Sequence, residues 1–218
     1  PAEINAWPSS SASSPLQLGQ ALISAGQAEV VIAGGVESYS RRPYRAHRNP
    51  DGTQTAYDQA PFTPWPDRDP DMAKAADDLA KHCAIDRHQQ DNWAIGSHAK
   101  ALASRAYLAS EICQIDTDLA KHDAYSRQLN TQLCARAKAI HGNVTHANTA
   151  VAADAAAFCV LTARHPETQH AVQLLGGVST GGDPYLPGLA PIRAIENVLD
   201  RHQLNTTKLT HIEIMEAF

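Results

Sequence analysis

The sequence of 218 residues predicts an α/β protein, and a short stretch near its beginning gives the first indication. Ser14-Pro15 is typical of a helix start, and leucine and isoleucine then recur at helical spacing as far as Gly26. Residues 30–33 form a β-branched run that ends at a glycine pair, which predicts a strand buried on both faces. Helix, glycine turn and buried strand in this order are typical of layered α/β folds.

The middle of the chain alternates between an irregular excursion and helices. Residues 41–71 contain six prolines, so we expect a long excursion outside the core. Residues 72–81 and 86–108 are alanine-rich at helical spacing and predict two surface helices, with Asp86 as the cap of the second.

Three further elements are predicted in the last third of the chain. Residues 152–161 predict a second buried strand, in which Cys159 would be a buried small apolar residue. Residues 191–202 predict an amphipathic helix, and residues 212–215 predict a final strand.

Charge and cysteine spacing exclude several classes of protein. The net charge is −5 and the basic residues form no long run, which excludes a nucleic-acid-binding role. No stretch approaches the ~18 apolar residues of a membrane span, and no signal-peptide pattern opens the sequence. The four cysteines form no CxxC pair, so we expect reduced thiols and a cytoplasmic protein.

The predicted core is thin because 38 of the 218 residues are alanine. Either small side chains pack closely, or part of the core comes from another chain or from sequence outside these residues.

Residues 25–44 read AGQAEVVIAGGVESYSRRPY, and this run resembles the AGxAxVVxAGGxExMSxxPY segment of the thiolase family. Five other segments resemble family motifs in the same order: 72–80 (MGxTAENLA), 85–91 (ISREEQD), 142–157 (GTVTAGNASGINDGAA), 188–195 (GIGPVPAI) and 214–218 (LNEAF).

The resemblance implies a layered α-β-α-β-α fold, present here as an incomplete, interior portion with a helical loop-domain insertion. Residues 1–38 and 142–165 would belong to the first half of that fold, residues 39–141 to the loop domain, and residues 166–218 to the start of the second half.

The resemblance also implies a C-acyltransferase that acts on acyl-CoA and acetyl-CoA thioesters by thiolytic cleavage or Claisen condensation, in lipid metabolism. Coenzyme A thioesters would be substrates, with no covalently bound cofactor. We expect a homo-oligomer or a complementary chain that completes the fold, and neither a nucleic-acid nor a membrane partner.

The sequence departs from the family pattern at positions that carry the family's catalytic and substrate-binding residues. The nucleophilic cysteine of the family aligns with Ser9, whose hydroxyl ionises far less readily than a thiol. The asparagine that holds the oxyanion water aligns with Met215, which cannot donate a hydrogen bond. Asn148 retains the family asparagine of the coenzyme A-binding segment, whereas Ala150 replaces its serine. The Gly-His-Pro motif and the second cysteine of the family have no counterpart in the sequence.

Two other groups are candidates for substrate binding. Met72 matches a family position in the acyl pocket, although a methionine at a helix start also has a plain packing explanation. A basic stretch could meet the phosphates of coenzyme A or could be a solvated loop; it contains Arg41, Arg42, Arg45, His47 and Arg48.

Three functions therefore stay open at this point. The chain is part of a thiolase-like acyltransferase, or it is a non-catalytic coenzyme A-binding or interaction module, or it is a hydrolase that uses the serines of residues 9–14. The last has no GxSxG motif to support it. No metal site is predicted, because the 11 histidines show no HxxxH spacing.

Overall fold

A computed structural model describes residues 13–58, 60–61, 63–113, 123–163, 171–215 and 218. The contacts divide the chain into two compact units, which are taken one at a time below. Unit 1 comprises residues 1–60, 152–181 and 191–212, and unit 2 comprises residues 61–151, 182–190 and 213–218.

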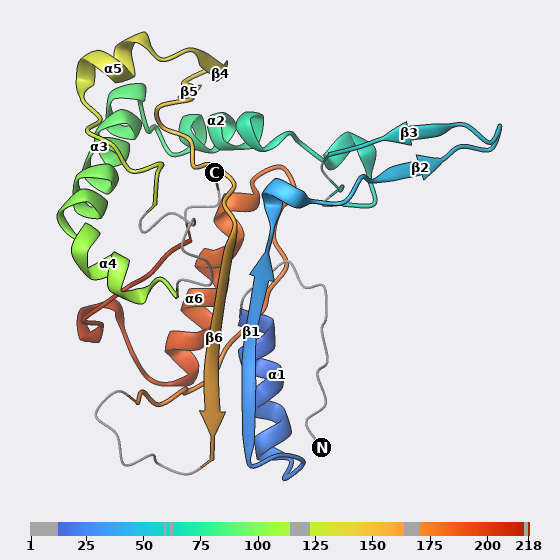
Figure 1. The fold of residues 1–218 in the computed structure, drawn as a ribbon, viewed down its shortest axis with the longest axis vertical. Coiled ribbons are helices and arrows are strands. Elements are labelled where there is room, and N and C mark those ends of the chain that lie inside the picture. The colour runs from blue at the N-terminus through green and yellow to red at the C-terminus, as the bar shows by residue number, and fades with distance from the viewer. Residues whose placement is uncertain (1–12, 59, 62, 114–122, 164–170, 216–217) are drawn as a thin grey trace. The chain divides into compact units, whose positions relative to one another are not determined.

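The centre of unit 1 is an antiparallel pair of strands, β1 (Val30–Glu37) and β6 (Ala155–Thr162). The register runs from Val30 opposite Thr162 to Glu37 opposite Ala155, and Figure 1 shows the two strands side by side. Helix α1 (Ser13–Ser24) packs on one face of the pair. It approaches closely at Gly19, where a Cβ atom would lie 2.6 Å from Leu161 Cδ1.

The prediction that residues 30–33 are buried on both faces is wrong. β1 continues through the glycine pair to Glu37, because β6 pairs with it along its whole length. On the face opposite α1, Ile32 is 72% exposed and Phe158 is 62% exposed. A strand is buried on both faces only when a layer lies on each face, and α1 supplies one such layer.

Cys159 is likewise exposed rather than buried, although it lies in the predicted strand. The strand itself is confirmed, with its start at Ala155.

The segment after β1 was predicted to be a long irregular excursion because of its prolines, but it contains regular secondary structure. A 3-10 helix η1 (Tyr39–Arg41) leads into a hairpin of β2 (Ala46–Arg48) and β3 (Gln54–Ala56). Gly52 turns the hairpin at a φ of +86°, and its amide donates to the Asn49 carbonyl.

Unit 1 ends with α6 (Ala190–Arg201), whose first residue belongs to unit 2, and with the 3-10 helix η4 (Thr206–Lys208). The helix confirms the amphipathic pattern of residues 191–202. The predicted strand at 212–215 is wrong, because residues 211–215 have no regular secondary structure. Apolar alternation makes a strand only where a neighbouring strand supplies the ladder of hydrogen bonds.

Unit 2 is mainly helical. Its described residues form a 3-10 helix η2 (Pro66–Arg68), four α-helices, a small hairpin and a 3-10 helix η3 (Pro187–Leu189). The α-helices are α2 (Met72–His82), α3 (Arg87–Ala103), α4 (Arg105–Glu111) and α5 (Thr131–Arg136), and the hairpin pairs β4 (Ala139–His141) with β5 (Val144–Thr145).

Side chains cap three of these helices. Asp86 caps α3, as predicted, and the structure adds a capping box with Gln89. Asp71 and Asn130 cap α2 and α5. The predicted helix over 86–108 is interrupted at Ser104, a residue type that favours helix ends because its hydroxyl competes for backbone groups.

One buried carboxylate joins α2 to the β4–β5 hairpin. Asp77 is fully buried, accepts a hydrogen bond from the Asn143 amide at 2.9 Å, and has the Lys81 ammonium 2.6 Å from its Oδ2. The Asn143 amide, followed by Lys81, holds the pKa of Asp77 below its ordinary value. Gly142 turns the hairpin directly against this carboxylate at a φ of +51°, where a Cβ atom would lie 2.2 Å from Asp77 Oδ2.

We expect Gly142→Ala to destabilise unit 2 by about 2 kcal/mol, because alanine strains the positive φ and displaces a buried carboxylate. Urea denaturation of the purified protein measures this change. The matched control is Gly96→Ala in α3, where a Cβ atom meets no other atom within 4 Å, and we expect it to be neutral or stabilising. Equal stability of Gly142→Ala and wild type would contradict the packing described for Asp77.

Candidate functional site

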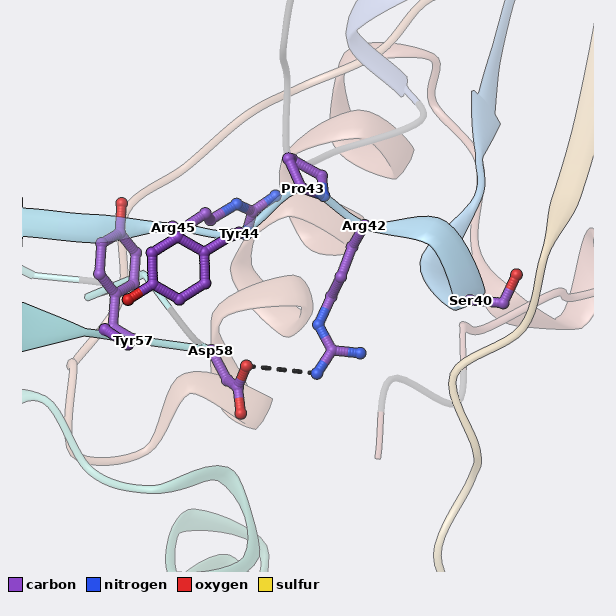
Figure 2. A pocket seen from close by; sticks show the side chains of 8 residues that line it. Ser40, Arg42, Pro43, Tyr44, Arg45, Tyr57 and Asp58 are labelled. Atoms are coloured by element: carbon purple, nitrogen blue, oxygen red, sulfur yellow. Dashed lines mark hydrogen bonds and ion pairs between the residues drawn. The ribbon is translucent and has the colours of Figure 1, made fainter.

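A pocket of about 350 Å³ lies in unit 1 where the segment after β1 meets the β2–β3 hairpin (Figure 2). Its walls come from two short stretches that the hairpin brings together. The lining residues are Ser40, Arg42, Pro43, Tyr44, Arg45, Ala56, Tyr57 and Asp58.

Arg42 reaches across the pocket to the opposite wall. Its NH2 group donates to Asp58 Oδ1 at 3.2 Å, and Figure 2 shows the side chain pointing at that carboxylate. The guanidinium carbon also lies 4.4 Å from the centre of the Tyr39 ring, which is cation–π geometry. These two contacts hold the charged group extended in the pocket.

The hairpin register fixes the other wall. The Tyr57 amide donates to the Arg45 carbonyl at 3.0 Å, one step beyond the Ala46–Ala56 pair. The Tyr57 ring stacks on His47 with the ring centres 4.5 Å apart. Arg45, Tyr57 and Asp58 are therefore placed by the hairpin.

A carboxylate near the start of β6 ties the base of the pocket to the sheet. Asp154 accepts hydrogen bonds from the Ser40 amide at 2.8 Å and from its hydroxyl at 2.5 Å. These two bonds hold the pKa of Asp154 below its ordinary value. Ser40 thereby sits at a fixed point two residues before Arg42.

The pocket has the chemistry of an anion site. The charged residues that line it are Arg42, Arg45 and Asp58, so positive charge is in excess. Guanidinium donors match the oxygens of phosphate, and aromatic rings offer flat apolar surface beside them. The described residues contain no group of three or more His, Cys, Asp or Glu side chains that could hold a metal ion.

Unit 2 contains a second concave region of about 440 Å³. Its wall from α3 is apolar, and the facing segment carries one cation, Arg127, whose guanidinium lies 4.8 Å from the Tyr125 ring centre. The lining residues are Ile95, Ala99, Leu102, Arg127, Gln128, Leu129 and Asn130.

Asn148 lies at the centre of a hydrogen-bond network in unit 2. Its Nδ2 donates to Asp91 Oδ1 at 3.0 Å and to the Asn143 carbonyl at 3.2 Å, while its Oδ1 accepts from the Thr145 amide at 2.7 Å. Arg87 Nε donates to both oxygens of Asp91 at 2.8 Å. The amide of Asn148 therefore fixes the turn after β5 against α3.

Met72, Ala150 and Met215, three of the other predicted site residues, do not line either pocket. Met72 is half-buried at the start of α2, Ala150 is exposed, and Met215 is 73% exposed. Ser9 lies outside the described residues. The roles assigned to these four positions remain predictions.

None of the cysteines has the setting of an acyl-accepting thiol. Burial, followed by the charge of Asp91, raises the pKa of Cys134, which disfavours the thiolate. Cys83 and Cys113 follow the ends of α2 and α4, and Cys159 lies within β6, so none of these three exposed thiols is at the amino end of a described helix, where a thiol's pKa is lowered.

The sequence analysis identified Arg42 and Arg45 but missed Tyr57 and Asp58. The signal was present in Asp51-Gly52, because a turn at that dipeptide folds the residues after it back against the arginines.

Comparison with known proteins shows the family. Residues 2–165 match the thiolase N-terminal domain, and the chain belongs to the thiolase family. It is 32% identical over 212 residues to "Putative acetyl-CoA C-acetyltransferase VraB" of Staphylococcus aureus strain MRSA252, and 26% identical to a protein of the same name from Staphylococcus epidermidis. Each match covers 90% of this chain but only 56% and 55% of the respective relatives, so the chain spans about half their length.

No helix in the described part of the chain has both the length and the apolar character needed to cross a membrane.

We expect Asn148→Ala to destabilise unit 2 by about 2 kcal/mol. The substitution removes the hydrogen bond that Asn148 donates to Asp91 and the one that it accepts from the Thr145 amide. Hydrogen exchange of residues 143–149 and urea denaturation measure the effect. The matched control is Asn92→Ala, an exposed asparagine on α3 bonded to His88, which should change stability by less than about 0.5 kcal/mol. Unchanged protection of residues 143–149 in Asn148→Ala would contradict the role of the network.

Proposed function

We propose that this chain binds coenzyme A thioesters as part of a thiolase-type C-acyltransferase. The observation that carries the proposal is the family match over residues 2–165, together with similarity to an acetyl-CoA C-acetyltransferase along 90% of the chain. The Arg42 and Arg45 pocket supports it as a phosphate-binding element of suitable chemistry.

In this proposal the chain supplies binding and orientation. The guanidinium groups of Arg42 and Arg45 bind phosphate oxygens of coenzyme A, and the bonds from Ser40 to Asp154 keep that wall in place. In the condensation catalysed by the family, a cysteine thiolate takes the acyl group of one acyl-CoA and releases coenzyme A, and the acyl group then passes to the α-carbon of acetyl-CoA, which gives up a proton to a base. In thiolysis the thiolate attacks the 3-oxo carbon of 3-oxoacyl-CoA, acetyl-CoA leaves, and the acyl group passes to coenzyme A. A serine at position 9 could do this only beside a strong base, because its hydroxyl holds its proton far more tightly.

A non-catalytic coenzyme A-binding or interaction module is the second candidate. The residues at the family's chemical positions favour it, since serine stands at position 9 and methionine at position 215. Binding without chemistry needs the pocket but neither of these two positions.

Replacement of the two pocket arginines tests the binding proposal. We expect Arg42→Gln and Arg45→Gln each to weaken coenzyme A binding about tenfold, since each removes a charge-assisted hydrogen bond to phosphate. Isothermal titration calorimetry measures the Kd. Arg48→Gln removes the same charge from the same hairpin outside the pocket and should change the Kd less than about twofold. No saturable binding by wild type would refute the proposal.

Turnover separates the two candidates. Purified protein is incubated with acetoacetyl-CoA and coenzyme A, and acetyl-CoA is measured by chromatography. Turnover that Ser9→Ala abolishes would establish the enzyme and remove the non-catalytic module, whereas coenzyme A binding without turnover supports the module. A fluorophosphonate probe that labels none of the serines of residues 9–14 removes the serine hydrolase.

A further inference from the structure

The pocket of unit 1 already contains an anion of its own. Asp58 is the acidic residue among those that line it, and its carboxylate accepts the hydrogen bond from Arg42 at 3.2 Å. The contact involves one nitrogen and one oxygen, so it uses only part of what a guanidinium can donate. Arg42 is therefore paired, but incompletely, before any ligand arrives.

The exposure of the two side chains shows which partner can leave. The side chain of Asp58 is 83% exposed, whereas that of Arg42 is 36% exposed. Water can solvate the carboxylate as soon as it rotates away, while Arg42 stays over the Tyr39 ring. Because the Tyr57 amide is bonded to Arg45, the backbone next to Asp58 is held by the hairpin and a side-chain rotation is enough.

We propose that Asp58 is an internal competitor that occupies the anion position of Arg42 in the free protein and is displaced when a phosphate group binds. The identity of that phosphate as part of coenzyme A rests on the proposed function, whereas the competition itself requires only an inorganic phosphate ligand. The carboxylate keeps the guanidinium extended and ready, and it lowers the affinity of the pocket by the stability of one exposed ion pair.

Inorganic pyrophosphate is the probe, titrated calorimetrically into the full chain at low salt. We expect Asp58→Asn to bind pyrophosphate about two- to fivefold more tightly than wild type. This change in Kd corresponds to the free energy that an exposed ion pair contributes. The matched control is Asp51→Asn on the same hairpin. Its side-chain oxygen still accepts the bonds from Thr53, so the turn is kept while one negative charge is removed outside the pocket. We expect this control to match wild type.

A double-mutant cycle distinguishes competition from simple charge repulsion. If Asp58 competes for Arg42, then Arg42→Gln/Asp58→Asn binds pyrophosphate no more tightly than Arg42→Gln alone. An equal gain in both backgrounds would show that Asp58 acts only through its charge and would overturn the proposal. Weaker binding by Asp58→Asn, or no pyrophosphate binding by any of these proteins, would overturn it as well.

The outcome for coenzyme A is read separately. If the pyrophosphate cycle behaves as expected while coenzyme A does not bind, the competition by Asp58 stands and the proposed function fails. If coenzyme A binds but Asp58→Asn has no effect on pyrophosphate affinity, the proposed function stands and the competition fails.

Discussion

The antiparallel pairing of β1 with β6 is the constraint on which unit 1 depends. It joins residues 30–37 to residues 155–162, and the pair ends with Glu37 opposite Ala155. The chain therefore leaves the sheet and returns to it at the same end. The bonds from Ser40 to Asp154 extend this closure beyond the last strand pair, and the segment that carries Arg42 begins there. The proposed phosphate site requires its donors to be in place before the ligand arrives, and the pairing of β1 with β6 fixes the point from which the Arg42 segment starts.

The core of unit 1 is thin because one face of the β1–β6 pair is exposed to solvent. The face away from α1 presents Ile32, Phe158 and Val160 to solvent, although their chemistry is that of a buried layer. Small residues dominate where packing is tight, as at Ala33 in β1 and at Ala73 and Ala75 in α2, all of which are buried. A two-stranded sheet with one helix gains little from apolar burial. Carboxylates join separate segments in each unit, Asp154 in unit 1 and Asp77 and Asp91 in unit 2.

The structural details that the sequence predicted correctly are local, whereas the resemblance to the thiolase family, which the match over residues 2–165 confirms, extends along most of the chain. The Asp86 cap of α3 was predicted because a capping side chain acts within one helical turn. The partner Gln89 was missed, although its spacing of three residues is typical of a capping box. The exposure of β1 and Cys159 could not be predicted in this way, because burial depends on which layers cover a strand rather than on its own residues. The pocket shows both cases. Arg42 and Arg45 belong to a basic stretch that is visible in the sequence. Asp58 joins the site only because the β2–β3 hairpin folds it back against these arginines.

The central claim is that this thiolase-family chain binds the phosphates of coenzyme A in the pocket after β1. A crystal structure of the protein with coenzyme A tests this claim most directly. The account predicts phosphate oxygens within hydrogen-bond distance of the Arg42 and Arg45 guanidinium groups, with the Asp58 carboxylate turned out toward solvent. Coenzyme A bound with its phosphates elsewhere, and with the Arg42–Asp58 ion pair intact, would contradict it.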